Sequence, residues 1–86
     1  MRLRITEDVL RQRLATNVRA RREAASLTLK VAAERAEMNV THWQKVEAGT
    51  VNVTLHTLVR LGDALDVDPA ELLADPGKRK ARGTAG

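Results

Sequence analysis

The side chains that most often perform catalysis or bind metals are few in this sequence, and their spacing indicates neither activity. There is no cysteine, and the two histidines, His42 and His56, are too few for a zinc site made of protein ligands alone. Four aspartates lie between residues 63 and 75, but they fall at a helix end and at a helix cap, which explains them without a metal ion. No Ser/His/Asp set or phosphate-binding loop is present. We expect a protein that is not an enzyme and has no metal, cofactor or small-molecule ligand.

A second set of side chains could bind a polar surface by hydrogen bonds and apolar contacts. Val40, Thr41, Gln44 and Lys45 recur at helical spacing, so a helix that begins at Val40 carries them on one side. Taken alone, these residues are most simply a solvated helix face. The alternative is a surface that reads the edges of bases in a DNA groove.

The elements that would position this set are predicted by helix caps and apolar spacing. Polar cap residues precede each apolar run, namely Thr6, Thr28, Asn39, Thr54 and Asp68. The predicted helices cover about residues 7–24, 29–36, 40–48, 55–65 and a last short stretch from 69 that ends before Asp75-Pro76-Gly77. Gly49 provides the stop after the third helix.

One apolar side of each helix should form a single core. We expect this core to contain Leu14, Val18, Leu27, Ala33, Trp43, Val46, Leu58, Leu61 and Leu65. Leu55 is also expected on the buried side of the fourth helix. Trp43 is the one aromatic residue, and its place one turn before Val46 favours a core role over base stacking.

Length and charge limit the class of protein further. The 86 residues suffice for one domain, which we place at residues 1–77, followed by a basic segment, 78–86, that we expect to be disordered. The net charge of +4 favours an acidic partner, although residues 50–77 hold one basic and five acidic side chains. No apolar run is long enough for a signal peptide or a membrane span, so we expect a cytoplasmic protein without a membrane partner.

Two short helices joined by about three residues are typical of a helix-turn-helix motif. Around them, the sequence resembles the lambda-repressor and Cro-like family of small transcriptional regulators, without gaps from about residue 18 to residue 73. The matching residues are Arg22, Leu27, Thr28, Ala33, Glu34, Arg35, Val46, Glu47, Gly49, Leu55, Thr57, Leu58, Leu61, Ala64, Leu65 and Val67. Asn52-Val53-Thr54 is similar to the controller proteins of restriction-modification systems. The resemblance implies an all-α, five-helix lambda-repressor-like DNA-binding domain in which helices 2 and 3 form the helix-turn-helix.

The resemblance also implies a role for individual residues. The third helix would contact bases through Val40, Thr41, Gln44 and Lys45. Chemically, an amide such as that of Gln44 can hold adenine by two hydrogen bonds, and the Lys45 ammonium can reach guanine or a phosphate. Contacts to the DNA backbone would come from Arg22, Lys30, His42, Thr50 and Asn52. Arg22 and Glu47 stand at the positions of an ion pair that joins the first and third helices.

Several positions depart from the family pattern, among them Val53, where a proline is common. Leu29 replaces a glutamine that usually bonds a phosphate. Glu37 replaces a glycine in the turn, so this residue either adopts a positive φ or the turn is reshaped. Trp43 replaces a smaller aliphatic residue, and we expect its indole to fill space that Ala32 and Ala36 leave.

The preferred interpretation is a homodimeric regulator of transcription, bound to double-stranded DNA at a palindromic operator. Leu72 and Leu73 would lie on the dimer side. The alternative is a protein-interaction module, such as an antitoxin or adaptor with the same fold. Leu29, Glu37 and the neutral charge of residues 28–49 favour this alternative.

Overall fold

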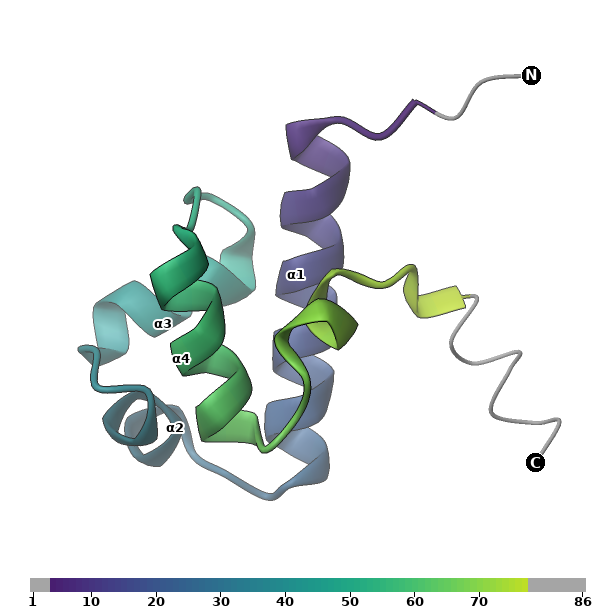
Figure 1. Ribbon diagram of the computed structural model, residues 1–86. Coiled ribbons are helices and arrows are strands. Elements are labelled where there is room, and N and C mark those ends of the chain that lie inside the picture. The colour runs from purple at the N-terminus through teal and green to yellow at the C-terminus, as the bar shows by residue number, and fades with distance from the viewer. Residues whose placement is uncertain (1–3, 78–86) are drawn as a thin grey trace, which may run out of the picture.

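The computed structural model describes residues 4–77, which form four α-helices and a short 3-10 helix (Figure 1). The elements are α1 (Glu7–Ala24), α2 (Leu29–Arg35), α3 (Val40–Ala48), α4 (Leu55–Leu65) and the 3-10 helix η1 (Pro69–Leu73). The helices α2, α3 and α4 gather on one side of α1, and η1 packs across the middle of α1. Within residues 4–77, no helix is long and apolar enough to cross a lipid bilayer. The segment predicted as a basic tail lies outside the described residues.

Each predicted cap begins a helix. The side chains of Thr6, Thr28, Asn39, Thr54 and Asp68 each accept a hydrogen bond from a backbone N–H two or three residues further on, at 2.7 to 3.2 Å. The helices α1 and α3 have the predicted bounds, whereas α2 ends one residue early, at Arg35. The last helix is 3-10 rather than α-helical, and the chain after it is extended at Ala74.

The turns that close α2 and α3 both need left-handed backbone. Gly49, with φ of 72°, ends α3. A Cβ atom at this position would lie 2.8 Å from the end of the flexible Gln12 side chain, which would have to move, so the positive φ is the stronger reason for glycine here. Glu37 has φ of 58°, which shows that the α2–α3 turn keeps a left-handed residue even though it is not glycine.

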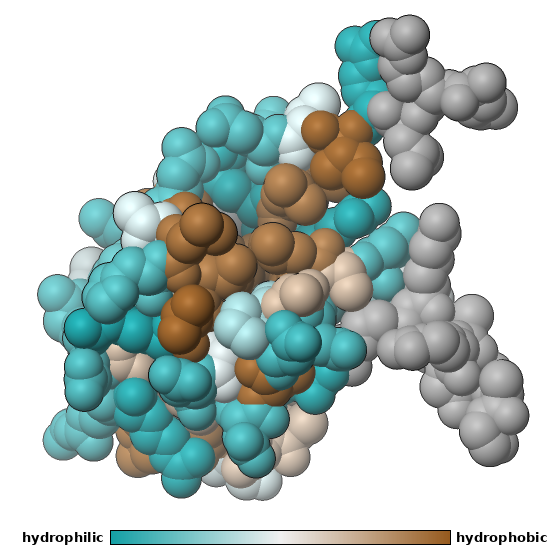
Figure 2. Space-filling model, viewed as in Figure 1, coloured by the Kyte–Doolittle hydropathy of each residue, from teal (hydrophilic) through white to brown (hydrophobic). Residues whose placement is uncertain are grey.

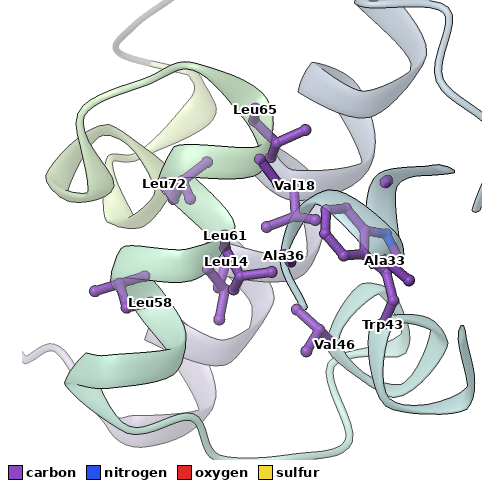
Figure 3. Close-up of a cluster of buried hydrophobic side chains, with 12 residues drawn as sticks. Leu14, Val18, Ala33, Ala36, Trp43, Val46, Leu58, Leu61, Leu65 and Leu72 are labelled. Atoms are coloured by element: carbon purple, nitrogen blue, oxygen red, sulfur yellow. The ribbon is translucent and has the colours of Figure 1, made fainter. Parts of the chain in front are cut away.

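The core lies between α1 and the other helices (Figure 3). Its largest fully buried side chain is Trp43, which lies in the same cluster as Val18 of α1. Ala32 and Ala36 are buried in the same cluster as the indole. The other predicted core residues that are buried are Leu14, Ala33, Val46, Leu58, Leu61 and Leu65. Leu27 is only partly buried and packs against the edge of this cluster.

Two leucines have environments opposite to those predicted. Leu55 is 80% exposed, not buried. At about 100° per residue along an α-helix, Leu55 lies roughly 120° around the axis of α4 from the fully buried Leu61. Leu58 and Leu65 lie within about 60° of Leu61, on the buried side of the helix. Leu72, predicted on the dimer side, is fully buried in the core of its own chain. It therefore presents no surface to a partner.

The burial of Leu72 depends on a polar residue of α1. Asn17 is 3% exposed, and its amide nitrogen donates to the carbonyl oxygens of Leu72 at 2.9 Å and Ala74 at 2.8 Å. These bonds satisfy backbone groups that η1 leaves unpaired, and they hold η1 against α1. With η1 held there, the Leu72 side chain points into the core.

Candidate functional site

The two sides of α3 differ sharply in burial. Trp43 and Val46 are at most 1% exposed and face the core, whereas Thr41, Gln44 and Lys45 are exposed. Val40, the fourth residue predicted to contact bases, is partly buried and packs against the core. The exposed side of α3 therefore carries a hydroxyl, an amide and an ammonium group within two turns.

The carboxylate of Glu47 fixes α3 to α1 and accepts three hydrogen bonds. Glu47 Oε2 accepts from Arg22 Nε at 2.6 Å and from Trp43 Nε1 at 2.6 Å, while Oε1 accepts from Arg22 Nη2 at 3.2 Å. The side chains of Arg22 and Glu47 are 14% and 10% exposed. The bond to Glu47 is the main cause that raises the pKa of Arg22 above its usual value.

The ion pair implied by the resemblance is thus part of a larger network. Arg22 Nη1 also donates to the carbonyl oxygen of Leu27 at 3.0 Å, which ties the end of α1 to the chain just before α2. The Trp43 indole bond was not predicted, although its i, i+4 spacing from Glu47 is a signal for such a contact on a helix. Together these bonds leave α3 little freedom to rotate against α1.

The α2–α3 turn is held by Arg60 of α4, a residue that the sequence did not single out. Arg60 Nη1 donates to the carbonyl oxygens of Ala36 at 3.4 Å and Glu37 at 3.2 Å, and lies 3.0 Å from Glu37 Oε1. Arg60 Nε donates to His56 Nε2 at 2.9 Å. The Glu37 carboxylate therefore pairs with a cation of its own chain. No local pattern connects residues 23 positions apart, which is why the contact was missed.

The residues predicted to contact the DNA backbone lie on several elements. Lys30 is exposed at the start of α2, and His42 is partly buried in the first turn of α3. Thr50 is exposed after α3, where its hydroxyl donates to the carbonyl oxygen of Lys45 at 3.3 Å. The carbonyl oxygen of the Asn52 side chain accepts from Arg11 of α1. A phosphate contact by Asn52 would therefore use its amide nitrogen.

Leu29 has a role in the fold that explains the absence of a polar residue. It is the first residue of α2, is partly buried and packs against the core cluster. A glutamine here would bring an amide to that apolar edge. The side chain at this position contributes to packing and has no polar group to offer a ligand.

Comparison with known proteins supports this geometry. A family model described as "Helix-turn-helix domain" matches residues 13–74. The structure is similar to the hypothetical transcription factor NHTF from Neisseria, with a TM-score of 0.85, 28% identity, and coverage of 92% of this chain and 89% of that one. It is also similar to the restriction-modification controller protein C.AhdI from Aeromonas hydrophila, with a TM-score of 0.69, 29% identity, and coverage of 72% and 94%.

A third similar structure is the clp gene regulator ClgR from Corynebacterium glutamicum, with a TM-score of 0.73, 25% identity, and coverage of 88% of this chain and 81% of that one. No curated protein matches the sequence. The family model covers most of the chain, including α2, the turn and α3.

Proposed function

Because the chain belongs to the Cro/CI-like helix-turn-helix family, we propose that it is a sequence-specific DNA-binding regulator of transcription that acts as a homodimer on a palindromic operator. The observation that carries the proposal is the contrast between the two sides of α3. Its inner side is locked by Trp43 and Glu47, and its outer side presents exposed polar groups. A rigid helix with such a face suits the reading of base edges.

In this proposal α3 enters the major groove, which is about 12 Å wide and admits an α-helix. Gln44 and Lys45 contact base edges, and Thr41 offers its methyl group or hydroxyl. Val40 contributes only the part of its side chain that the core leaves exposed. This division assigns specificity mainly to one turn of α3.

The DNA backbone is contacted from the elements around α3. Lys30 and Thr50 are exposed on either side of this helix, and Asn52 follows in the α3–α4 loop. Arg22 uses three of its nitrogen atoms within the protein, so its role is mainly to hold α3, with its remaining N–H groups available to a phosphate.

Two features that favoured a protein-interaction module have explanations within the fold. Leu29 packs against the core, and the charge of Glu37 pairs with Arg60. The Glu37 side chain is 74% exposed, but its charge has a partner within the chain. No observation on α3 favours the alternative.

A salt titration tests DNA binding directly. The protein is titrated onto the DNA upstream of its own gene and onto an unrelated duplex, at a series of salt concentrations. A regulator loses affinity linearly in log salt, because phosphate contacts release counterions, and it prefers one duplex at every salt concentration. Equal and weak binding to both duplexes at low salt would contradict the proposal.

Replacing Gln44 with alanine tests base reading. The preferred duplex is first selected from a random pool with the unmodified protein. We expect Gln44→Ala to weaken binding to that duplex by about 1–3 kcal/mol and to leave binding to unrelated DNA unchanged. Binding to unrelated DNA is the matched control, since it requires the folded protein but no base reading. The fold should persist, because Gln44 is exposed and its loss leaves the core intact. An equal loss on both duplexes would remove Gln44 from the base-reading set.

A further inference from the structure

An apolar groove lies between the first turns of α1 and the start of α4. Its apolar lining comes from Leu10, Leu14, Val53, Leu55, Leu58 and Leu73, and its volume is about 260 Å³. Figure 2 shows apolar side chains gathered over this part of the molecule. None of the residues assigned to DNA contact on α3 lines it. The groove is therefore separate from the proposed base-reading side of α3.

Two of the apolar side chains that line the groove are exposed. Leu55 of α4 is 80% exposed, and Leu10 of α1 is 36% exposed. Exposed apolar groups that gather at one place mark an interaction site more often than chance placement does. Outside the described residues, the sequence offers only Met1 and Leu3 as large apolar side chains. These residues could cover little of the groove.

We propose that this groove is the surface on which a second copy of the chain docks. A two-fold interface places the same patch on both partners, so it needs a projection and a recess side by side. The exposed Leu55 is such a projection, and it borders the recess formed by Leu10, Leu58 and Leu73. Leu55 of one copy inserts into the groove of the other, and the reverse contact forms by symmetry.

The rim of the groove suits a second copy despite the net positive charge of the protein. Glu7, Arg11 and Asn52 border the groove, and Arg11 pairs with the neighbouring Asp8. The rim holds one acidic and one basic side chain, so two identical rims meet without strong repulsion. A uniformly basic or acidic rim would have favoured a partner of opposite charge instead.

The position of the groove links dimer formation to operator reading. Leu55 is the first residue after the α3–α4 loop, and Asn52 of that loop bonds to Arg11 of α1. Pairing through Leu55 therefore fixes how far apart the two α3 helices lie. An operator with half-sites one helical turn apart requires such a fixed separation, about 34–36 Å. The inference rests on the proposed function and assigns its dimer surface to Leu55 and Leu73 rather than Leu72.

Replacing Leu55 with aspartate tests this surface. The mass of the protein in solution is measured by sedimentation equilibrium without DNA. Each dimer buries Leu55 twice, so we expect Leu55→Asp to raise the dimer dissociation constant by about 100-fold or more. The fold should persist, because Leu55 is exposed and an acid is favourable at the start of a helix. The thermal unfolding of the variant checks this.

The matched control is Val31→Asp, which places the same charge on an exposed apolar position of α2 outside the groove. We expect this variant to remain a dimer. If Leu55→Asp stays as dimeric as the unmodified protein, or if the unmodified protein is a monomer at micromolar concentrations, the inference is overturned. The latter outcome leaves a different protein as the occupant of the groove.

The DNA titration keeps this test distinct from that of the proposed function. If the unmodified protein selects one duplex but its mass shows no dimer, the regulator remains and the dimer surface fails. If the protein forms a Leu55-dependent dimer but selects no duplex, the dimer surface stands and the regulator fails. When both hold, Leu55→Asp should also weaken binding to the palindromic duplex more than to a single half-site.

Discussion

Glu47 is predicted to be the residue whose loss most weakens the attachment of α3. Its carboxylate accepts three hydrogen bonds, two from Arg22 and one from the indole of Trp43. Replacing Glu47 with alanine removes all three at once. It leaves a guanidinium that is 14% exposed and an indole N–H that has lost its acceptor.

The magnitude follows from the burial of this network. Breaking a fully buried ion pair by removing one partner costs about 3–5 kcal/mol, and an indole N–H left without a partner costs about 1–3 kcal/mol. The two costs overlap, and the slight exposure of Arg22 and Glu47 reduces the first. We expect a loss of about 3 kcal/mol in the free energy of unfolding. For a domain of this size that lowers the melting temperature by roughly 12–24 °C.

Trp43 provides the assay, since it is the one aromatic residue of the chain and sits in the network itself. Urea unfolding followed by its fluorescence gives the free energy of unfolding of Glu47→Ala and of the unmodified protein. The matched control is Glu23→Ala. Glu23 pairs with Arg19 on the surface of α1, where the two side chains are 58% and 65% exposed.

The control compares the loss of an exposed ion pair with the loss of a buried one. We expect Glu23→Ala to cost less than about 0.5 kcal/mol, because exposed pairs contribute little. The reasoning would be refuted if Glu47→Ala cost under about 1 kcal/mol, close to the control. That result would mean that Arg22 and Trp43 find other partners readily and that the network does not hold α3.

Two further variants test how the backbone is held elsewhere. Asn17→Ala should lower the free energy of unfolding by about 2 kcal/mol, because the carbonyl oxygens of Leu72 and Ala74 lose a buried donor. The rate of amide hydrogen exchange should rise first in η1. Unchanged protection of the η1 amides would contradict this prediction. Ser26→Gly should raise the free energy of unfolding by about 0.5–1 kcal/mol, because Ser26 has φ of 58°, where glycine is unstrained. A decrease on urea unfolding would show that Ser26 contributes more than its backbone conformation.

Local signals placed the helices. The caps Thr6, Thr28 and Asn39 each bind a backbone N–H three residues on, so the start of a helix depends on a few neighbouring residues. Gly49 ends α3 in the same local way. The positions of Trp43 and Val46 one turn apart likewise predicted the inner side of α3, since helical geometry alone puts them together.

Amino-acid type alone did not decide which leucines are buried. Leu55 and Leu72 have the same side chain, yet one is 80% exposed and the other is fully buried. The difference arises from where α4 and η1 lie against α1, which depends on contacts such as that of Asn17 with residues 54 to 57 positions away. The spacing of apolar residues predicts which side of a helix is buried, but not how much of that side a neighbouring element covers.

The sequence by itself determined the helices of this protein, the two-helix unit around the turn and the polar side of α3, because caps, spacing and the glycine stop act over a few residues. Only the tertiary structure decided how that unit is held. Arg60 reaches the turn from 23 residues away, and Arg22 reaches Glu47 from 25 residues away. The packing of the helices also leaves Leu55 exposed beside an apolar groove. These contacts join distant elements, and their geometry exists only once the helices have packed.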